Sequence, residues 1–484
     1  MEDTLIGTPE AQCRARPGGP IFLSWPQAGL WPHVEIFWDG DETEVQTSQS
    51  PKPYPSLQSV KGASLVGKAY RISPQPNAVA IQKRVQDWIR NCDETHTDCR
   101  PVVQNFPARL LDLQGSGADG IQLVQGFASV EYVALSHRWG DKPPCATTTD
   151  NIADRMSSIS WSELAETFQD AVVVTRQIGI RYLWIDCLCI IQNDILDWKK
   201  ESVKMGDIYR GAYLTIAASL TSGDDDKFLR PSREREVYAA TRLQVSFREE
   251  AIPDLWIRTI HDFRLHSFYG VQEPLAARGW TMQERVLSPR LLSYTSAVTF
   301  ECTEAAVCEC GNGLFPDPHY PPIHMLQGLD NKHAFLNLLK KGNIKTMYAL
   351  WMDMVTIYTG RHLSFNSDRH VAILSIAKVL ADKYGDEYIA GMWRGDLINS
   401  LCWYRDDSSP TIHLGPRQAP SWSWFSAQGR VFRQDAAVEA YCEVMSLDVQ
   451  DGGINDSGPA RGSITLRAQA VTMILHMNKT CQGR

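Results

Sequence analysis

The sequence lacks the long apolar run of a membrane helix and the excess of basic residues that is typical of nucleic-acid-binding proteins. No stretch approaches the roughly 20 consecutive apolar residues that a transmembrane helix needs. Acidic residues outnumber basic ones, 56 to 48, so we expect no integral membrane segment and no nucleic-acid partner. The opening MEDTLIGTPEAQCRARPGG has no basic and then apolar order of a signal peptide, which predicts a cytoplasmic protein.

General catalytic motifs are also missing. The chain has no Walker loop, no G-x-G-x-x-G fingerprint and no Ser-His-Asp order that would name a reaction. Its 12 cysteines are scattered along the sequence, so in the cytosol we expect most of them to be reduced. Any catalytic activity must therefore be inferred from residues outside these general motifs.

The middle of the chain, residues 131–313, has an α/β pattern. Strands are expected at 132–135, 182–191 and 213–218, and helices at 163–177 and 197–209. This alternation predicts right-handed βαβ crossovers and a parallel sheet. A charged, irregular insertion at about 221–277 precedes a short helix at 280–287 and two further strand-like segments.

The flanking regions differ in composition from this domain. Residues 1–75 form a variable N-terminal segment with a Pro- and Ser-rich linker at 47–59, where few apolar residues are available to form a core. Residues 76–130 predict a helix from about Asn77 and then a hairpin. Residues 314–484 predict a C-terminal region that is first helical and then β-rich.

The stretch YVALSHRWG (132–140) ends a predicted strand in Ser136, His137, Arg138 and Trp139. Ligands of open parallel sheets bind beyond the carboxyl ends of the strands. An arginine beside a glycine turn can hold phosphate, and a tryptophan can stack on a base. The alternative is that Arg138 and Trp139 cap and cover the end of the sheet.

A carboxylate, Asp186, lies in the apolar segment GIRYLWID. Because an unpaired buried carboxylate is costly, Asp186 must be hydrogen-bonded or paired. It could orient a ribose or another side chain, or it could bind backbone N–H groups and serve the structure alone. Asp194 follows in the next loop, where it could equally cap a helix.

A second carboxylate, Glu284, lies one helical turn after Trp280 in the segment RGWTMQER. A glutamate near an aromatic ring could stabilise the oxocarbenium ion that develops when a glycosidic bond is cleaved. The alternatives are a surface glutamate paired with Arg278 or Arg285, and a structural carboxylate.

Cys92, His96 and Cys99 have a spacing that zinc ligands use. A structural zinc site needs four ligands, however, and only three are local. No metal site is therefore predicted, and these three residues are retained as candidates only.

Taken together, these blocks resemble the HET domain, the heterokaryon-incompatibility domain of filamentous fungi. The resemblance extends from about Tyr132 to Cys310, and segments such as SDRHVAILSIAKVLA (367–381) and APSWSWFSAQGRV (419–431) look like the usual companions of that domain. It implies a fungal protein of non-self recognition that triggers programmed cell death, together with an allelic or non-allelic incompatibility partner protein.

The HET domain is regarded as distantly similar to TIR domains, which implies a TIR-like, flavodoxin-like sheet and a homo-oligomer formed through this domain. TIR enzymes cleave NAD at the nicotinamide–ribose bond with a glutamate on a helix after a tryptophan. Glu284 would then be catalytic, and NAD would be a substrate rather than a resident cofactor. Two features depart from TIR domains: the long insertion, and Thr281 at a position where a cysteine often follows the tryptophan.

On the same resemblance, Arg138 would hold the NAD diphosphate, and Trp139 or Trp280 would stack on a ring. Ser136, His137 and Asp186 would complete the binding site.

Two other functions fit the sequence. The domain could be a non-catalytic signalling scaffold that acts by self-assembly, or the chain could be an enzyme of fungal specialised metabolism. The substitution Glu284→Gln separates the scaffold from the NAD-cleaving enzyme, because only the enzyme requires the carboxylate.

Overall fold

In the computed structural model the chain divides into two compact units, residues 1–336 and 337–484. The linker expected at 47–59 lies outside the residues that the structure describes. These are 12–15, 21–24, 33–39, 68–102, 105–115, 119–127, 129–140, 145–236, 239–243, 245–247, 250–252, 255–259, 273–311, 331–365, 368–405, 419–433, 442–450, 453 and 460–468.

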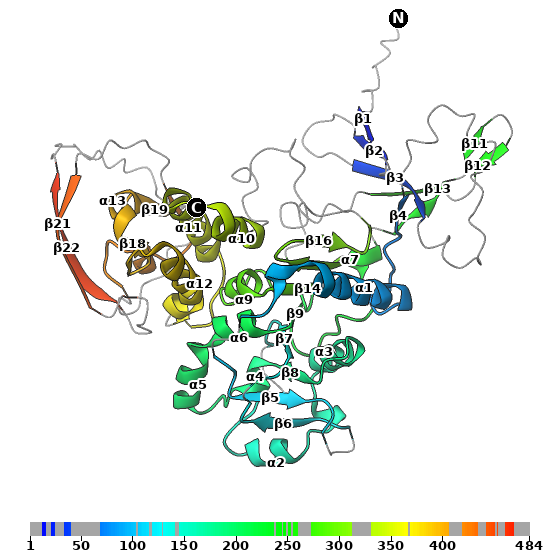
Figure 1. The fold of residues 1–484 in the computed structure, drawn as a ribbon, viewed down its shortest axis with the longest axis horizontal. Coiled ribbons are helices and arrows are strands. Elements are labelled where there is room, and N and C mark those ends of the chain that lie inside the picture. Colours follow the sequence, from blue (N-terminus) through cyan, green and yellow to red (C-terminus); the bar gives the residue numbers. More distant parts are fainter. Residues whose placement is uncertain are drawn as a thin grey trace, which may run out of the picture. The chain divides into compact units, whose positions relative to one another are not determined.

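An eight-stranded sheet forms the core of the first unit, with the strand order β16-β15-β14-β9-β7-β8-β5-β6 (Figure 1). Its strands are β5 (Arg109–Asp112), β6 (Gln122–Gln125), β7 (Tyr132–Ser136), β8 (Tyr182–Trp184), β9 (Leu214–Ala217), β14 (Arg290–Tyr294), β15 (Val298–Cys302) and β16 (Ala306–Cys308). The central strands β14, β9, β7 and β8 are parallel. They form the α/β centre that the sequence predicts.

The outer strands are antiparallel, so the prediction of a parallel sheet is wrong for the whole sheet, which is mixed. β5 pairs antiparallel with both β6 and β8, and β15 pairs antiparallel with both β14 and β16. For β14 and β15 the reason is the length of the connection. Only three residues join β14 to β15, and a short turn can join only antiparallel neighbours, whereas a parallel pair needs a crossover of a dozen residues or more.

Helices cover the central strands on two faces. The β7–β8 connection holds α2 (Ile152–Ser157) and α3 (Glu166–Gln177), the β8–β9 connection holds α4 (Asp186–Cys189), α5 (Ile195–Ser202) and α6 (Met205–Gly211), and α9 (Thr281–Leu287) precedes β14. The chain moves in one direction across the sheet from β7 to β8 and in the opposite direction from β8 to β9 and β14. Right-handed crossovers therefore place α3 on one face and α6 and α9 on the other. Figure 1 shows this arrangement, and α6 packs against α9.

Two predicted elements of this region are wrong in detail. The strand expected at 182–191 ends at Trp184, and α4 follows from Asp186. A short apolar run fits a buried strand and a buried helix turn equally well, so periodicity cannot separate them.

The single helix expected at 197–209 is two helices, α5 and α6. Glu201, in the last turn of α5, is buried, and its carboxylate accepts a hydrogen bond from the Ala108 amide at 3.0 Å.

The predicted helix near Asn77 is confirmed as α1 (Val79–Thr95), which is followed by the short η3 turn (Thr97–Cys99). α1 buries Ile81, Val85, Ile89 and Cys92 along one side. Its Trp88 stacks on Phe300 of β15, with 6.5 Å between the ring centroids. The helix is thereby held against the antiparallel edge of the main sheet.

The insertion at 221–277 is not wholly irregular, as the sequence had suggested. It contains α7 (Arg233–Glu236), β10 (Thr241–Arg242), β11 (Val245–Phe247), β12 (Glu250–Ile252) and β13 (Leu255–Thr259). The N-terminal segment contributes β1 (Gln12–Ala15), β2 (Ile21–Ser24), β3 (His33–Asp39) and β4 (Lys68–Ala69). Because β13 pairs antiparallel with β3, strands from the insertion and the N-terminal segment belong to one sheet.

The second unit is helical and then β-rich. Its helices are α10 (Asn331–Lys341), in which the boundary between the units falls, α11 (Ile344–Thr359), α12 (Asp368–Tyr384) and α13 (Leu397–Ser400). Its strands are β17 (Tyr388–Ile389), β18 (Met392–Trp393), β19 (Trp403–Arg405), β20 (Val431–Arg433), β21 (Cys442–Gln450) and β22 (Arg461–Ala468).

Gly391 organises the core of the second unit. Trp351 and Trp424 both donate their indole N–H to its carbonyl, at 2.8 and 2.7 Å. Its φ is +94°, and a Cβ atom would lie 2.7 Å from the Trp424 indole nitrogen, so the position requires glycine.

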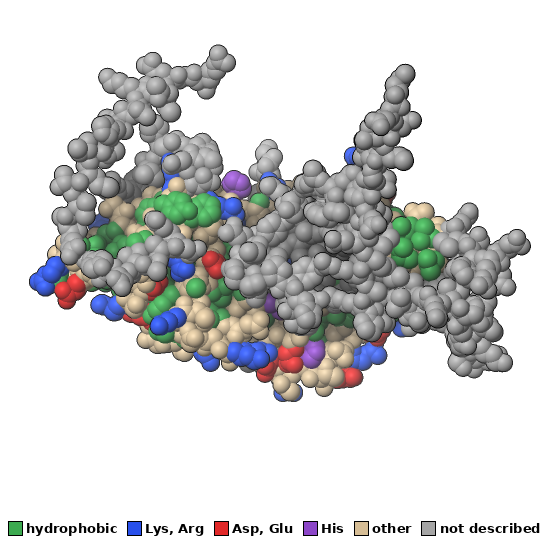
Figure 2. All heavy atoms as spheres, turned by 90° about the horizontal axis from the view of Figure 1, so that it is seen from above, with side chains coloured by type: hydrophobic (Ala, Val, Ile, Leu, Met, Phe, Trp, Pro, Cys, Tyr) green, Lys and Arg blue, Asp and Glu red, His purple; other side chains and the backbone are tan. Residues whose placement is uncertain are grey.

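None of the described helices has the length and apolar content to span a bilayer. On the face that Figure 2 shows, basic and acidic side chains of the described residues are interspersed. Neither sign of charge dominates the described part of this face.

Candidate functional site

Polar side chains gather beyond the carboxyl ends of β7, β8 and β9. Ser136 is the last residue of β7, Asp186 follows β8 by two positions, and Asp224 lies in the loop after β9. The connections that leave β7 and β9 run in opposite directions across the sheet. In open α/β sheets, such a reversal of strand order is where ligands bind.

Glu284 reaches this cluster from α9. Its carboxylate accepts a hydrogen bond from the Ser136 hydroxyl at 2.5 Å, and the residue is only 5% exposed. Burial raises the pKa of Glu284 to about 7; the Ser136 hydrogen bond opposes this shift and the nearby negative charge of Asp186 adds to it. A carboxyl with such a pKa can exchange a proton near neutral pH.

His137 lies between two carboxylates. Its Nε2 atom is 3.1 Å from Asp224 Oδ1 and 3.7 Å from Asp186 Oδ1, in ion-pair contact without a linear hydrogen bond. Burial lowers the pKa of His137, but Asp186 and Asp224 outweigh it and the net pKa is raised. The two carboxylates thus stabilise the imidazolium form of His137 relative to that of a free histidine.

Further contacts fix the loop after β7. The Trp139 indole N–H donates to Asp186 Oδ2 at 2.8 Å, and the Gly140 amide donates to Asp224 Oδ2 at 3.2 Å. The Arg278 guanidinium donates to the His137 carbonyl at 3.1 Å. The loop thus connects the ends of three strands with the segment that leads into α9.

The structure brings most of the predicted site residues together. Ser136, His137, Trp139, Asp186 and Glu284 form one connected cluster. Arg138 is exposed and pairs with no other described residue.

Trp280 is half-buried at the N-cap of α9 and packs on the main core. It lies one helical turn before Glu284, which places both side chains on the same side of the helix.

Sequence reasoning missed three members of this site. Asp224 lies within the run Asp224-Asp225-Asp226, which the sequence assigns to an irregular, charged insertion. The Tyr209 hydroxyl donates a hydrogen bond to the Leu135 carbonyl at 3.1 Å. Burial raises the pKa of Tyr209, and the nearby charge of Glu284 raises it further. Arg278 was weighed only as an ion-pair partner of Glu284.

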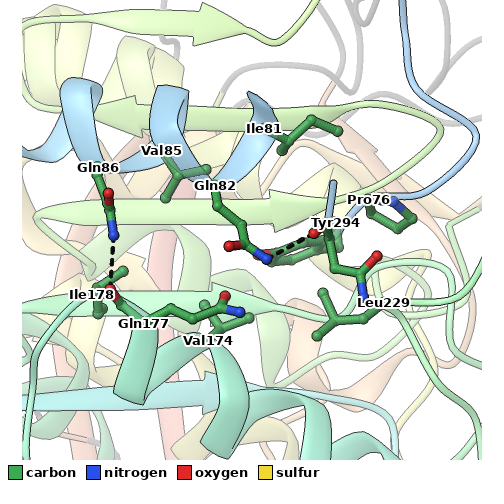
Figure 3. Close-up of a pocket in the computed structure, with 11 residues that line it drawn as sticks. Pro76, Ile81, Gln82, Val85, Gln86, Val174, Gln177, Ile178, Leu229 and Tyr294 are labelled. Atoms are coloured by element: carbon green, nitrogen blue, oxygen red, sulfur yellow. Dashed lines mark hydrogen bonds between the residues drawn. The ribbon is translucent and has the colours of Figure 1, made fainter. Parts of the chain in front are cut away.

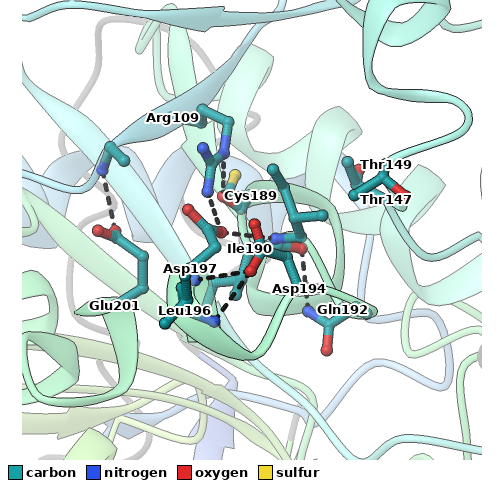
Figure 4. A network of polar contacts seen from close by, with 12 residues as sticks. Arg109, Thr147, Thr149, Cys189, Ile190, Gln192, Asp194, Leu196, Asp197 and Glu201 are labelled. Atoms are coloured by element: carbon teal, nitrogen blue, oxygen red, sulfur yellow. Dashed lines mark hydrogen bonds and ion pairs between the residues drawn. The ribbon is translucent and has the colours of Figure 1, made fainter. Parts of the chain in front are cut away.

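Asp194 and its neighbours prove to be structural. The Asp194 carboxylate accepts hydrogen bonds from the Leu196 and Asp197 amides and caps α5. Figure 4 shows the buried network beside it, in which Arg109 donates to Asp197 and, at 2.8 Å, to the Cys189 carbonyl. Burial raises the pKa of Asp197, but the hydrogen bonds from Arg109 and the Ile191 amide outweigh it, and the net pKa is lowered.

A separate pocket lies between α1 and α3 (Figure 3), with an empty volume of about 310 Å³ that includes space open to solvent. Ile81 and Val85 line it from α1, and Val174 and Gln177 from α3. It contains none of the predicted site residues, so it gives no support to the candidate site.

Cys92, His96 and Cys99, the candidate metal ligands, lie together, and the structure adds Cys302 to them. A second group of potential ligands, His137, Asp186 and Cys187, belongs to the site at the sheet end. This second group offers only three potential ligands, one fewer than a structural zinc site needs.

Residues 132–284 match the family model described as Heterokaryon incompatibility protein (HET). The matched region begins with the first residue of β7 and ends at Glu284, so it contains the whole cluster described above. No curated protein and no solved structure gives a significant match to the chain. The resemblance to the HET domain is therefore confirmed for this region, whereas the TIR-like part stays a prediction.

Proposed function

Since residues 132–284 form a HET domain, we propose that the chain is a fungal cytoplasmic protein of non-self recognition that triggers programmed cell death by cleaving NAD. One observation carries the enzymatic part of the proposal. Glu284 is a buried carboxyl whose pKa is raised to about 7, and it lies where the strand order reverses. Active sites favour carboxyls with pKa values near neutrality.

The strand order supports a TIR-like arrangement. The parallel strands run β8-β7-β9-β14, which corresponds to 2-1-3-4 when they are numbered along the chain. This is the order with which a flavodoxin-like sheet begins, and ligands of such sheets bind between the first and third strands. Here these strands are β7 and β9, the strands that Ser136 and Asp224 follow.

The proposed reaction breaks the bond between the ribose C1′ and the nicotinamide nitrogen of NAD. The electron pair of this bond goes to the nicotinamide, and the ribose becomes an oxocarbenium ion that the ionised Glu284 stabilises. Water then adds to C1′ and releases a proton to solvent, which gives ADP-ribose. Arg138 would bind the diphosphate, and Trp139 or Trp280 would stack on a ring.

The substrate would have to enter from the side of Asp186, whose side chain is 20% exposed. Asp186 could accept hydrogen bonds from the ribose hydroxyls in place of the one it now receives from Trp139. Glu284 itself is almost completely buried, so the ribose can reach it only if the side chains around Asp186 move apart.

The same burial favours a second function, that of a scaffold without catalysis. Glu284 is already hydrogen-bonded to Ser136, and His137 is already paired with two carboxylates. A closed cluster of this kind could simply hold the loops of a domain that signals by forming homo-oligomers. In either case we expect an incompatibility partner protein and no nucleic-acid partner.

Expression in a filamentous fungus separates the two functions. The wild-type chain, Glu284→Gln and the exposed control Glu163→Gln would be expressed at matched levels while cell viability and cellular NAD are measured. The proposal predicts that the wild type and Glu163→Gln deplete NAD and kill, and that Glu284→Gln does neither. Killing by Glu284→Gln without NAD depletion would contradict the enzymatic proposal and establish the scaffold.

A further inference from the structure

Three cysteines and a histidine converge where the end of α1 meets the end of β15. Cys92 lies in the last turn of α1, His96 is its C-cap, Cys99 ends the η3 turn and Cys302 ends β15. Their ligand atoms all lie within 4.8 Å of one another. The three cysteines are fully buried, and His96 is half-buried.

The dimensions fit a tetrahedral zinc site. With zinc–sulfur bonds of about 2.3 Å and zinc–nitrogen bonds of about 2.0 Å, sulfur atoms lie about 3.8 Å apart, and sulfur and nitrogen about 3.5 Å apart. Cys302 Sγ is 3.3 Å from His96 Nδ1, close to that value. A small outward movement of the more closely spaced side chains would accommodate the ion.

Hydrogen-bond donors lie next to two of the ligand sulfurs. The Ala305 amide donates to Cys302 Sγ at 3.1 Å, and the Arg290 Nε atom donates to Cys92 Sγ at 3.3 Å. Three thiolates and a neutral imidazole around Zn²⁺ carry a net charge of −1. The buried guanidinium of Arg290, which also pairs with Asp93 at 2.6 Å, would offset part of this charge. N–H donors and cations next to the ligand sulfurs are the usual outer partners of metal sites.

The other buried cysteines of the described residues lack such a set of neighbours. Cys308 and Cys310 are adjacent to each other, but no histidine and no further thiol completes a group of four with them. Cys145 and Cys189 belong to no group of potential metal ligands among the described residues, and Cys187 belongs to a group of only three, with His137 and Asp186. The cluster of Cys92, His96, Cys99 and Cys302 thus differs from a core that merely contains cysteine.

We propose that Cys92, His96, Cys99 and Cys302 bind one zinc ion with a structural role. Four protein ligands fill the tetrahedral shell and leave no open position for a substrate, as in structural rather than catalytic zinc sites. The proposal does not depend on the proposed function.

The position of the site indicates what the ion would do. Three ligands precede the matched HET region, residues 132–284, and Cys302 follows it. His96 and Cys302 are 206 positions apart, and the ion would join the two ends of this long segment. A link of this kind removes conformational freedom from the unfolded chain and holds α1 against β15.

The test measures metal content in the full-length chain, purified under reducing conditions without chelator. Elemental analysis of the wild type should give one zinc per chain, and Cys302→Ser and Cys99→Ser should retain almost none. Cys308→Ser, a buried cysteine on the neighbouring strand, is the matched control and should keep its zinc. A folded wild-type chain that neither contains zinc nor takes it up, or variants at Cys99 and Cys302 that keep the full amount, would overturn the proposal.

A second measurement needs no substitution, in case the variants do not fold. Wild-type protein in which cobalt replaces zinc should show the ligand-field and thiolate charge-transfer bands of a tetrahedral cobalt site. A mercurial reagent that modifies thiols should release the bound zinc in proportion to the cysteines that react. A cobalt spectrum without thiolate bands, or a disulfide among these cysteines in protein from reducing cytosol, would contradict the assignment.

Discussion

Two buried polar clusters lie near the carboxyl end of β8, and they shift the pKa values of their carboxyl groups in opposite directions. In one, Arg109 and the Ile191 amide satisfy Asp197, and its pKa is lowered. In the other, burial dominates over the Ser136 hydrogen bond, and the pKa of Glu284 is raised. The first carboxylate stabilises the fold through its charge, whereas the second costs stability when it ionises, which is the pattern of a site kept for chemistry.

The largest expected effect comes from breaking the stabilising cluster. Arg109→Met leaves the Asp197 carboxylate, whose side chain is only 13% exposed, without its charged partner. We expect a loss of about 3–5 kcal/mol in the free energy of unfolding. Denaturant titration of the purified chain measures it.

Arg181→Met is the matched control, because Arg181 also pairs with a buried aspartate, Asp112, but is half exposed. It should lose clearly less stability. Equal losses in the two variants would mean that burial does not distinguish these ion pairs.

Glu284→Gln, unlike Arg109→Met, should gain stability relative to wild type as the pH rises. The pKa of Glu284 rises from 4.5 to about 7 on folding, so its protonated form favours the folded state below pH 4.5, and this advantage disappears as the pH rises to 7. The shift corresponds to roughly 3 kcal/mol. The stability of Glu284→Gln relative to wild type should therefore increase by about that amount between pH 4.5 and pH 8.

Unfolding curves for both proteins at several pH values measure this difference. Glu301→Gln, in β15, is the matched control. Burial raises the pKa of Glu301, but Arg285, His333 and Lys332 outweigh burial, and the net pKa is lowered. Its stability relative to wild type should fall rather than rise with pH. A pH-independent difference for Glu284→Gln would show that Glu284 has an ordinary pKa.

The smallest effect is expected at Asp194, whose side chain caps α5. Asp194→Ala should reduce the free energy of unfolding by about 1 kcal/mol, since two amide donors lose their acceptor. Catalysis should not change, because Asp194 does not contact the Glu284 cluster among the described residues. Loss of NAD cleavage in this variant at unchanged stability would extend the site to the α5 loop.

The sequence predicted the central strands and the main site residues because strand ends and polar clusters coincide there. Ser136 and Asp186 lie at the ends of apolar runs. Such runs end at the carboxyl ends of parallel strands, where open α/β sheets bind their ligands. Asp224 was missed because a run of aspartates resembles a solvated loop. Cys302 was missed because its partners are about 200 positions away in the sequence, and only the pairing of β15 with β14 and its packing on α1 bring them together.

Release of nicotinamide from NAD by the purified chain, at pH 6 and pH 8, tests the central claim most directly. The wild type and Glu163→Gln should release nicotinamide faster at pH 8, because the ionised Glu284 increases as the pH passes its pKa of about 7. Glu284→Gln should release almost none at either pH. Release by Glu284→Gln at the wild-type rate, or no release by a folded wild-type chain over a range of concentrations that includes its oligomer, would contradict the account.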